Sequence, residues 1–263
     1  MKKTVKKTNF DGPLLDTIKV SLDESTDFTS YPFTLALIKN LKEIKFPNQV
    51  TFFVGENGTG KSTILEAIAT KAGFGSEGGS KNITFKTSEQ KAYQGTELFS
   101  EQLTLSWRQK PKDGYFFRAE SFFNVANHLD YLARECGGPE IAFAPYGGIS
   151  LHAQSHGESF LSFFKNRLGY GGFFILDEPE AALSPQRQLT LLALIDQLCK
   201  NTNAQFIIAT HSPILLAYPH ATIYSCDSDA LKRIEYFQTD HYQITKRFLD
   251  NPQRYLELLF DQE

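Results

Sequence analysis

The sequence predicts an α/β fold in which helices flank a mostly parallel core sheet. Val50–Val54 is a compact β-type run, followed by a glycine-rich turn and then by a helical pattern over Ser62–Lys71. Further along, strand patterns over Phe173–Leu176 and Gln205–Ala209 enclose a helical pattern over Pro185–Lys200. Strands that alternate with helices imply crossover connections between parallel strands. We therefore expect the ligand at the carboxyl edge of this sheet.

An antiparallel β subdomain is expected in the N-terminal part of the chain. Leu14–Leu22 alternates loosely between apolar and polar residues, and Leu98–Trp107 and Tyr115–Arg118 have the composition of strands. The turn-rich segment 110–114 separates the last two, which predicts an antiparallel hairpin. Helical spacing of apolar residues then predicts a helix over Ser121–Cys136.

Composition and charge are those of an ordinary globular protein. The 263 residues are 41% hydrophobic and 22% charged, with a net charge of −3, so the chain as a whole lacks the strongly basic signature of many nucleic-acid binders. Its apolar runs fall far short of the roughly 20 residues that cross a bilayer, and its Lys-rich start is not followed by the apolar segment of a secretory signal. We expect no transmembrane segment and a cytoplasmic location. Three scattered cysteines fit neither a disulfide framework nor a CxxC motif and are expected to be reduced: Cys136, Cys199 and Cys226.

The strongest motif is an unbroken GxxxxGK[ST] pattern between a predicted strand and a predicted helix. Glycines in this pattern permit backbone angles that aim successive amides at phosphates, and the helix that follows adds the positive end of its dipole. We expect Lys61 to reach the β- and γ-phosphates and to act in catalysis by stabilising charge, and Ser62 to bind Mg²⁺. The candidate nucleotide-binding residues here are Gly55, Glu56, Asn57, Gly58, Thr59, Gly60, Lys61, Ser62 and Thr63.

A pair of carboxylates ends the apolar strand Phe173–Leu176. Because successive side chains of a strand point in opposite directions, Asp177 can face the Mg²⁺ while Glu178 faces an attacking water. We assign Asp177 to the metal and Glu178 to general-base catalysis. The sequence therefore predicts hydrolysis of ATP to ADP and phosphate, with ATP and Mg²⁺ as the bound groups.

These motifs resemble those of the ABC-type ATPase superfamily, in particular its soluble SMC-like and RecF-like branch and the short bacterial proteins described as AAA-family ATPases. Ser155-His156-Gly157-Glu158 is similar to the signature motif of the family, although His156 stands where a glycine is usual. The resemblance implies that Ser155, Gly157 and Glu158 contact the nucleotide of a second subunit. It therefore implies an ATP-dependent homodimer, arranged head to tail around two nucleotides.

The resemblance also suggests roles for residues downstream of the acidic pair. Ser184 stands where the D-loop of the family has an aspartate, and His211 is similar to the switch histidine that senses the γ-phosphate. The whole chain, 1–263, is expected to form one ABC-type domain. Its parts are a P-loop lobe with antiparallel strands over 1–118, a helical signature segment over 119–170, and a segment with the acidic pair, switch histidine and C-terminus over 171–263.

Four residues keep alternative interpretations. Glu120 is a candidate Mg²⁺ ligand in place of the family's Q-loop glutamine, and Arg118 could contact phosphate, but either residue could equally form a structural salt bridge. Tyr31 and Phe33 could stack on adenine, although core packing is the simpler interpretation for both.

The biological role has several candidates. The first is an ATP-dependent dimerisation switch in DNA or RNA maintenance or defence, with nucleic acid or a nuclease as partner. The second is a regulatory or scaffold subunit that binds a protein partner in its ATP state. A nucleotide-binding subunit of a transporter is a third.

Overall fold

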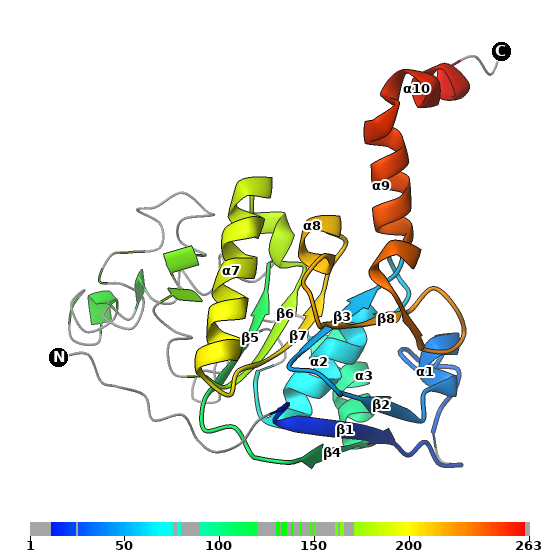
Figure 1. Cartoon of the computed structure of the whole chain (residues 1–263). Helices are drawn as coiled ribbons and strands as arrows, with labels where there is room; N and C mark the ends of the chain where they lie inside the picture. The colour runs from blue at the N-terminus through cyan, green and yellow to red at the C-terminus, as the bar shows by residue number, and fades with distance from the viewer. Residues whose placement is uncertain are drawn as a thin grey trace.

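A six-stranded sheet forms the centre of the molecule (Figure 1). The structure is a computed structural model, and it describes residues 12–24, 26–75, 78–79, 90–119, 130–131, 133–135, 138, 143, 148, 150, 161–162, 164–165 and 171–260. The first five strands of the sheet are parallel and the sixth pairs antiparallel at one edge, which confirms the predicted core. In spatial order the strands are β5 (Gly114–Arg118), β6 (Phe173–Asp177), β7 (Gln205–Ala209), β3 (Val50–Val54), β8 (Thr222–Ser225) and β9 (Lys232–Ile234).

The second sheet is the predicted antiparallel subdomain. Its strands lie in the order β2 (Glu43–Lys45), β1 (Leu15–Val20) and β4 (Leu103–Trp107), with both pairings antiparallel. The side chain of Gln205, at the start of β7, joins the two sheets through hydrogen bonds to both backbone groups of Leu15.

Alternate side chains of the core sheet pack into two hydrophobic cores, one on each face. Phe53 of β3 points to the face covered by α2 (Lys61–Ala72) and α3 (Gln90–Glu101), and Phe52 points to the face covered by α7 (Pro185–Asn201) and α8 (Pro213–Leu216). All residues of β3, β6 and β7 are buried, as expected for parallel strands covered on both sides. The fold therefore fixes the carboxyl ends of these three strands.

One expectation for the N-terminal half is wrong. Residues 98–101 belong to α3 rather than to a strand, and β4 and β5 form no hairpin. Instead, β4 pairs with β1 and β5 pairs in parallel with β6. The turn-rich segment between them is thus a connection between two sheets, a long-range outcome that its local composition does not reveal.

The remaining short elements frame the sites described below. A small helix, α1 (Ala36–Asn40), lies near the second sheet, and a 3₁₀ turn, η3 (Pro179–Ala182), follows β6. The chain ends in a second 3₁₀ turn, η4 (Tyr236–Gln238), and two helices, α9 (Asp240–Asp250) and α10 (Pro252–Phe260). Within the described ranges, no helix combines the length and apolar character that a membrane span needs.

The helices α9 and α10 project away from the core sheet as an arm (Figure 1). Neither helix contains a buried residue. The exposed large apolar side chains of η4 and this arm are Phe237, Ile244, Phe248, Leu249, Leu256, Leu258, Leu259 and Phe260.

Candidate active site

The loops that leave β3, β6 and β7 meet at one edge of the core sheet. The glycine-rich segment follows β3, the acidic pair lies at the end of β6, and His211 follows β7. Because β7 lies between β3 and β6, His211 is delivered between the phosphate loop and the carboxylates. This is the sheet edge at which open α/β folds bind ligands.

The phosphate loop wraps back on itself and is held by its own lysine. Lys61 is 4% exposed, and its Nζ donates to the backbone oxygens of Gly55 and Glu56 at 2.6 and 2.9 Å. Burial lowers the pKa of Lys61, while the nearby Cys226, Glu178 and other acidic groups act in the opposite direction. The loop thus places a cation across its own opening, where the β- and γ-phosphates of a nucleotide are expected.

Gly55 can only be a glycine in this loop. Its φ is +146°, and a Cβ there would lie 2.8 Å from Oδ1 of Asp227. The same carboxylate oxygen accepts the backbone N–H of Glu56 at 2.7 Å, so Asp227, just after β8, braces the start of the loop. Gly58 and Gly60 also have positive φ values, which only glycine adopts at low cost.

Ser62 and Asp177 meet between the loop and β6. The Ser62 hydroxyl donates to Oδ1 of Asp177 at 3.0 Å. Oδ2 of Asp177 lies 3.6 Å from Nε of Arg118, whose Nη1 in turn lies 3.3 Å from Oε2 of Glu66 in α2. Arg118 therefore holds Asp177 and Glu66 together in a salt-bridge network. Of the two interpretations of this residue, a phosphate contact and a structural salt bridge, the structure shows the salt bridge. The contact between Arg118 and Asp177 orients the Asp177 carboxylate toward Ser62.

Ser62 and Asp177 fit the requirements of Mg²⁺. A serine hydroxyl and a carboxylate are hard oxygen donors, and Mg²⁺ prefers one or two such protein ligands together with phosphate and water oxygens. Among the residues that the structure describes, no group of three or more His, Cys, Asp or Glu side chains could hold a metal ion without other ligands. A magnesium ion bound here would therefore depend on the phosphates of the nucleotide.

Glu178 turns away from Asp177 toward the switch histidine. Its backbone is in the left-handed region, with φ 50° and ψ 53°, an uncommon conformation for a residue other than glycine. Its backbone N–H donates to the Ala209 carbonyl at 3.0 Å, which ties the turn to the end of β7. Oε1 of Glu178 lies 3.5 Å from Nε2 of His211. The two carboxylates therefore have different neighbours, and their roles toward metal and water stay predictions.

His211 is fixed by two groups that the sequence analysis did not identify. Its backbone N–H donates to Oε1 of Glu180 at 2.6 Å, and its Nδ1 lies 2.9 Å from Nε2 of His241 in α9. Burial raises the pKa of Glu180. Nε2 of His211 is buried and has no hydrogen-bond partner within the described part of the chain. That atom lies beside Glu178 with its hydrogen-bonding capacity unused.

Several residues predicted for the site cannot be placed. Glu120, Ser155, Gly157 and Glu158 lie outside the described residues, so their roles stay predictions. Lys61, Ser62, Asp177, Glu178 and His211 come together as described above. Glu56, Asn57 and Gly58 form the exposed tip of the loop, and Thr63 is buried in α2.

The two aromatic candidates for the adenine have different environments. Phe33 is buried and packs edge-on against Phe99 of α3, which confirms core packing for that residue. Tyr31 is 52% exposed, and its hydroxyl lies 2.5 Å from the hydroxyl of Thr63. Tyr31 is thus an accessible ring beside the first turn of the phosphate-loop helix.

Sequence reasoning missed Asp227, Glu66, Glu180 and His241. Asp227 had a usable signal, because it is a carboxylate that follows a strand of the same sheet. Glu66 also had one, since it lies four residues after Ser62 on the same helix. Glu180 also had one, since it follows the acidic pair by only two residues, whereas His241 had none, because a helix remote from the motifs brings it to His211.

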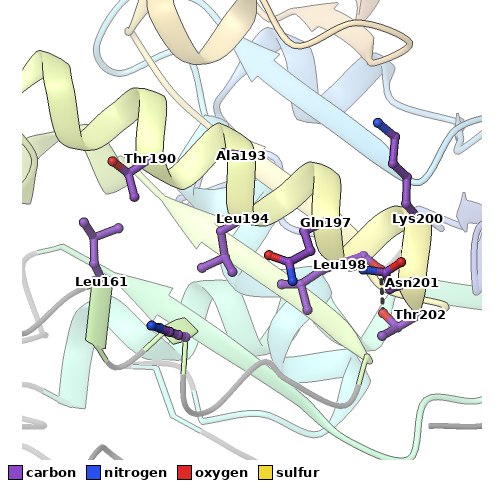
Figure 2. Close-up of a pocket in the computed structure, with 10 residues that line it drawn as sticks. Leu161, Thr190, Ala193, Leu194, Gln197, Leu198, Lys200, Asn201 and Thr202 are labelled. Atoms are coloured by element: carbon purple, nitrogen blue, oxygen red, sulfur yellow. Dashed lines mark hydrogen bonds between the residues drawn. The ribbon is translucent and has the colours of Figure 1, made fainter. Parts of the chain in front are cut away.

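The described residues also form two cavities outside the phosphate loop. A cavity of about 930 Å³ lies along α7 and is lined by Leu161, Leu194 and Thr202, among other residues (Figure 2). Thr202 there donates to the Leu198 carbonyl. A second cavity, of about 750 Å³, lies between α7, α8 and α9 and is bordered by His211 and Glu180. Only the second cavity touches the candidate site.

Two family models match parts of the chain. The model described as "AAA domain, putative AbiEii toxin, Type IV TA system" matches residues 100–217. Another, described as "AAA domain", matches residues 27–125. The first match includes β5, β6 and β7, and the second includes β3 and the phosphate loop.

The chain also resembles known ATP-binding proteins. It is 28% identical over 206 residues to the cytochrome c biogenesis ATP-binding export protein CcmA of Bartonella henselae, covering 74% of this chain and 90% of the relative. Among solved structures it is similar to cbiO1 of Clostridium perfringens, part of the ABC transporter complex cbiONQ, with a TM-score of 0.53 and 18% identity, covering 95% of this chain and 99% of that one. The chain therefore has the ABC-type ATPase fold, and it is similar to AAA-domain family models over parts of its length and to a curated ATP-binding protein.

Proposed function

We propose that this chain binds Mg-ATP at the edge formed by β3, β6 and β7 and hydrolyses it to ADP and phosphate. The observation that carries the proposal is the division between neighbouring carboxylates. Asp177 accepts from Ser62 of the phosphate-loop helix at 3.0 Å, whereas Glu178 lies 3.5 Å from the switch histidine. Metal binding and activation of water require these two separate positions.

Each group of the chain has one task in this reaction. The loop amides and Lys61 bind and neutralise the phosphates, and Ser62 and Asp177 hold the metal. Bound Mg²⁺ neutralises the charge that develops on the phosphate oxygens. Glu178 accepts a proton from the attacking water, and His211 donates a hydrogen bond to a γ-phosphate oxygen through Nε2.

The experiment that tests this proposal compares wild-type protein with Glu178→Gln. Glutamine keeps the size of the side chain but cannot accept the proton, so single-turnover ATP hydrolysis should fall about 10²–10⁴-fold, while the Kd for ATP changes little. Glu97→Gln, in α3, is a matched control and should hydrolyse ATP at the wild-type rate. Wild-type turnover in Glu178→Gln would remove Glu178 from its role.

We further propose that two copies close head to tail around two ATP molecules. The support is the resemblance of Ser155, Gly157 and Glu158 to the family signature, which implies that these residues complete the site of the opposite subunit. In this proposal residues 1–263 form one cytoplasmic domain, and ATP binding joins two domains that hydrolysis separates. Glu120 is retained as a candidate metal-side residue.

The partner of this dimerisation switch has three candidates. We favour association with nucleic acid or a nuclease in maintenance or defence, which agrees with the toxin–antitoxin description of the matching family. A nucleotide-binding subunit of an exporter is the second candidate, because the curated relative is an ATP-binding export protein. ATPase stimulation by DNA or RNA with steep salt dependence would select the first. Copurification of Glu178→Gln with a membrane protein in Mg-ATP would select the second. Copurification with a stoichiometric soluble protein would select the third candidate, a regulatory or scaffold subunit.

A further inference from the structure

A histidine of the C-terminal helix contacts the switch histidine directly. Nε2 of His241 lies 2.9 Å from Nδ1 of His211, and the two ring centroids are 5.0 Å apart. His241 lies in the first turn of α9, which begins at Asp240, and the hydroxyl of the N-cap residue Thr239 accepts the backbone N–H of Tyr242 at 3.3 Å. This cap fixes the start of α9, and thus the position of the His241 backbone.

The surroundings of His211 decide which ring donates. A hydrogen bond between two neutral imidazoles needs one N–H and one unprotonated nitrogen. Nε2 of His211 faces Oε1 of Glu178 at 3.5 Å, and a carboxylate favours an N–H over a lone pair at that position. With the proton on Nε2, Nδ1 of His211 must accept, so Nε2–H of His241 must donate.

The charges around His241 favour the same arrangement. Burial lowers the pKa of His241, as do the neighbouring His211 and Lys61, while Asp227 and Glu56 act in the opposite direction. A neutral His241 has one N–H, and the bond to His211 uses it. Glu180 accepts the backbone N–H of His211, so both the main chain and the side chain of this histidine are held.

We infer that His241 is a positioning residue: its Nε2–H holds His211 in the Nε2–H form, directed at Glu178 and at the γ-phosphate. This inference rests on the proposed ATPase function. In this form His211 donates a hydrogen bond to a phosphate oxygen, whereas the Nδ1–H form would present a lone pair and repel it. Preorganised donors of this kind stabilise the charge of the transition state.

The placement of His241 also links catalysis to the arm. The cavity of about 750 Å³ between α7, α8 and α9 separates much of α9 from the core, and α9 contains no buried residue. The contact with His211 lies at the base of the arm, in its first turn. A displacement of α9 would therefore withdraw the N–H donor from the switch histidine.

The experiment compares two substitutions of His241 in the full-length protein. The terminal nitrogen of glutamine can occupy the position of Nε2 and donate an N–H, while alanine cannot. His241→Ala should lower kcat about 10–100-fold, the effect of removing a group that orients a metal-bound histidine and taken here as the scale for His211, with the KM for ATP changed less than threefold. His241→Gln should recover most of kcat. His220→Asn, an exposed histidine on the same domain, should keep wild-type values.

Two results for kcat would overturn the inference. One is a wild-type kcat in His241→Ala, and the other is a His241→Gln variant as slow as His241→Ala. A loss confined to KM would also contradict it, because positioning of His211 acts in the transition state.

Imidazole ¹⁵N NMR of the nucleotide-free protein tests the hydrogen bond without any activity. In the wild type, His211 should be protonated at Nε2 and unprotonated at Nδ1, with its signals identified by their loss in His211→Gln. In His241→Ala, the Nδ1–H form should become populated. A wild-type His211 that is protonated at Nδ1 would refute the assignment. If the wild type failed to hydrolyse ATP but showed the expected NMR signals, the proposed function would fail while the hydrogen bond stood.

Discussion

The phosphate-loop side of the site and its switch side are built in different ways. On the first side, Lys61 bonds to backbone oxygens five and six residues before it. On the second, His211 depends on Glu180 and His241, which lie 31 and 30 residues away. The phosphate-loop side is therefore specified by a contiguous motif, whereas the switch side requires the whole C-terminal half to fold.

This difference indicates which parts of the site a binding partner could displace. The loop, its lysine and the Ser62–Asp177 contact lie against buried strands and are held by the core. His211 is held partly by a helix with an exposed, apolar continuation. Substitutions on the first side should weaken nucleotide binding or lower stability, whereas removal of the hydrogen-bonding groups that hold His211 should alter rates.

Replacement of the buried lysine of the loop should have the largest effect. Lys61→Ala removes a cation that faces the phosphates, and a charge-assisted contact of this kind contributes about 2–3 kcal/mol. The Kd for ATP should rise about 30–150-fold by titration calorimetry. Lys71→Ala, at the exposed end of the same helix, is the control and should bind like wild type. An unchanged affinity for ATP in Lys61→Ala would contradict the proposed contact of Lys61 with the phosphates.

The Arg118 network should contribute stability as well as orientation. Arg118→Met removes a guanidinium that pairs with the carboxylates of Asp177 and Glu66, and both of these side chains are at least 90% buried. Loss of a buried partner costs several kcal/mol, and partial exposure of Arg118 reduces the expected loss to about 2 kcal/mol. Denaturant unfolding should detect this decrease.

The exposed ion pair between Arg108 and Asp16 provides the control for the stability loss in Arg118→Met. Its side chains are 46% and 39% exposed, and surface pairs contribute about 0–1 kcal/mol. Arg108→Met should therefore cost less than Arg118→Met. Equal losses would show that Arg118 acts only as another surface charge.

Glu180→Gln should have the smallest effect and should change only the pH dependence of stability. Because burial raises the folded pKa of Glu180 above its ordinary value of 4.5, this carboxyl favours the native state most at low pH. Its contribution is lost as pH rises through the raised pKa. Glutamine stays neutral and can still accept the His211 N–H. Across pH 5 to 8, the variant should lose less unfolding free energy than wild type, and identical slopes would contradict the burial of this charge.

The predictable part of the molecule is the part encoded by short-range patterns. The strands at Val50–Val54 and Phe173–Leu176 and the phosphate loop were predictable because apolar runs and glycine spacing identify them locally. The partner of β4 was not, because strand composition does not specify which sheet a strand joins. His241 was not predictable either, since a histidine in an amphipathic helix carries no sign of the remote ring that it will contact.

The most direct test of the central claim is the mass of Glu178→Gln in solution with and without Mg-ATP. Sedimentation should give 29.7 kDa for the nucleotide-free chain and about twice that mass at saturating Mg-ATP. The double variant Lys61→Ala/Glu178→Gln should remain monomeric in both conditions. A Glu178→Gln protein that binds ATP at full occupancy and still sediments as a monomer would contradict the account of a site completed by a second subunit.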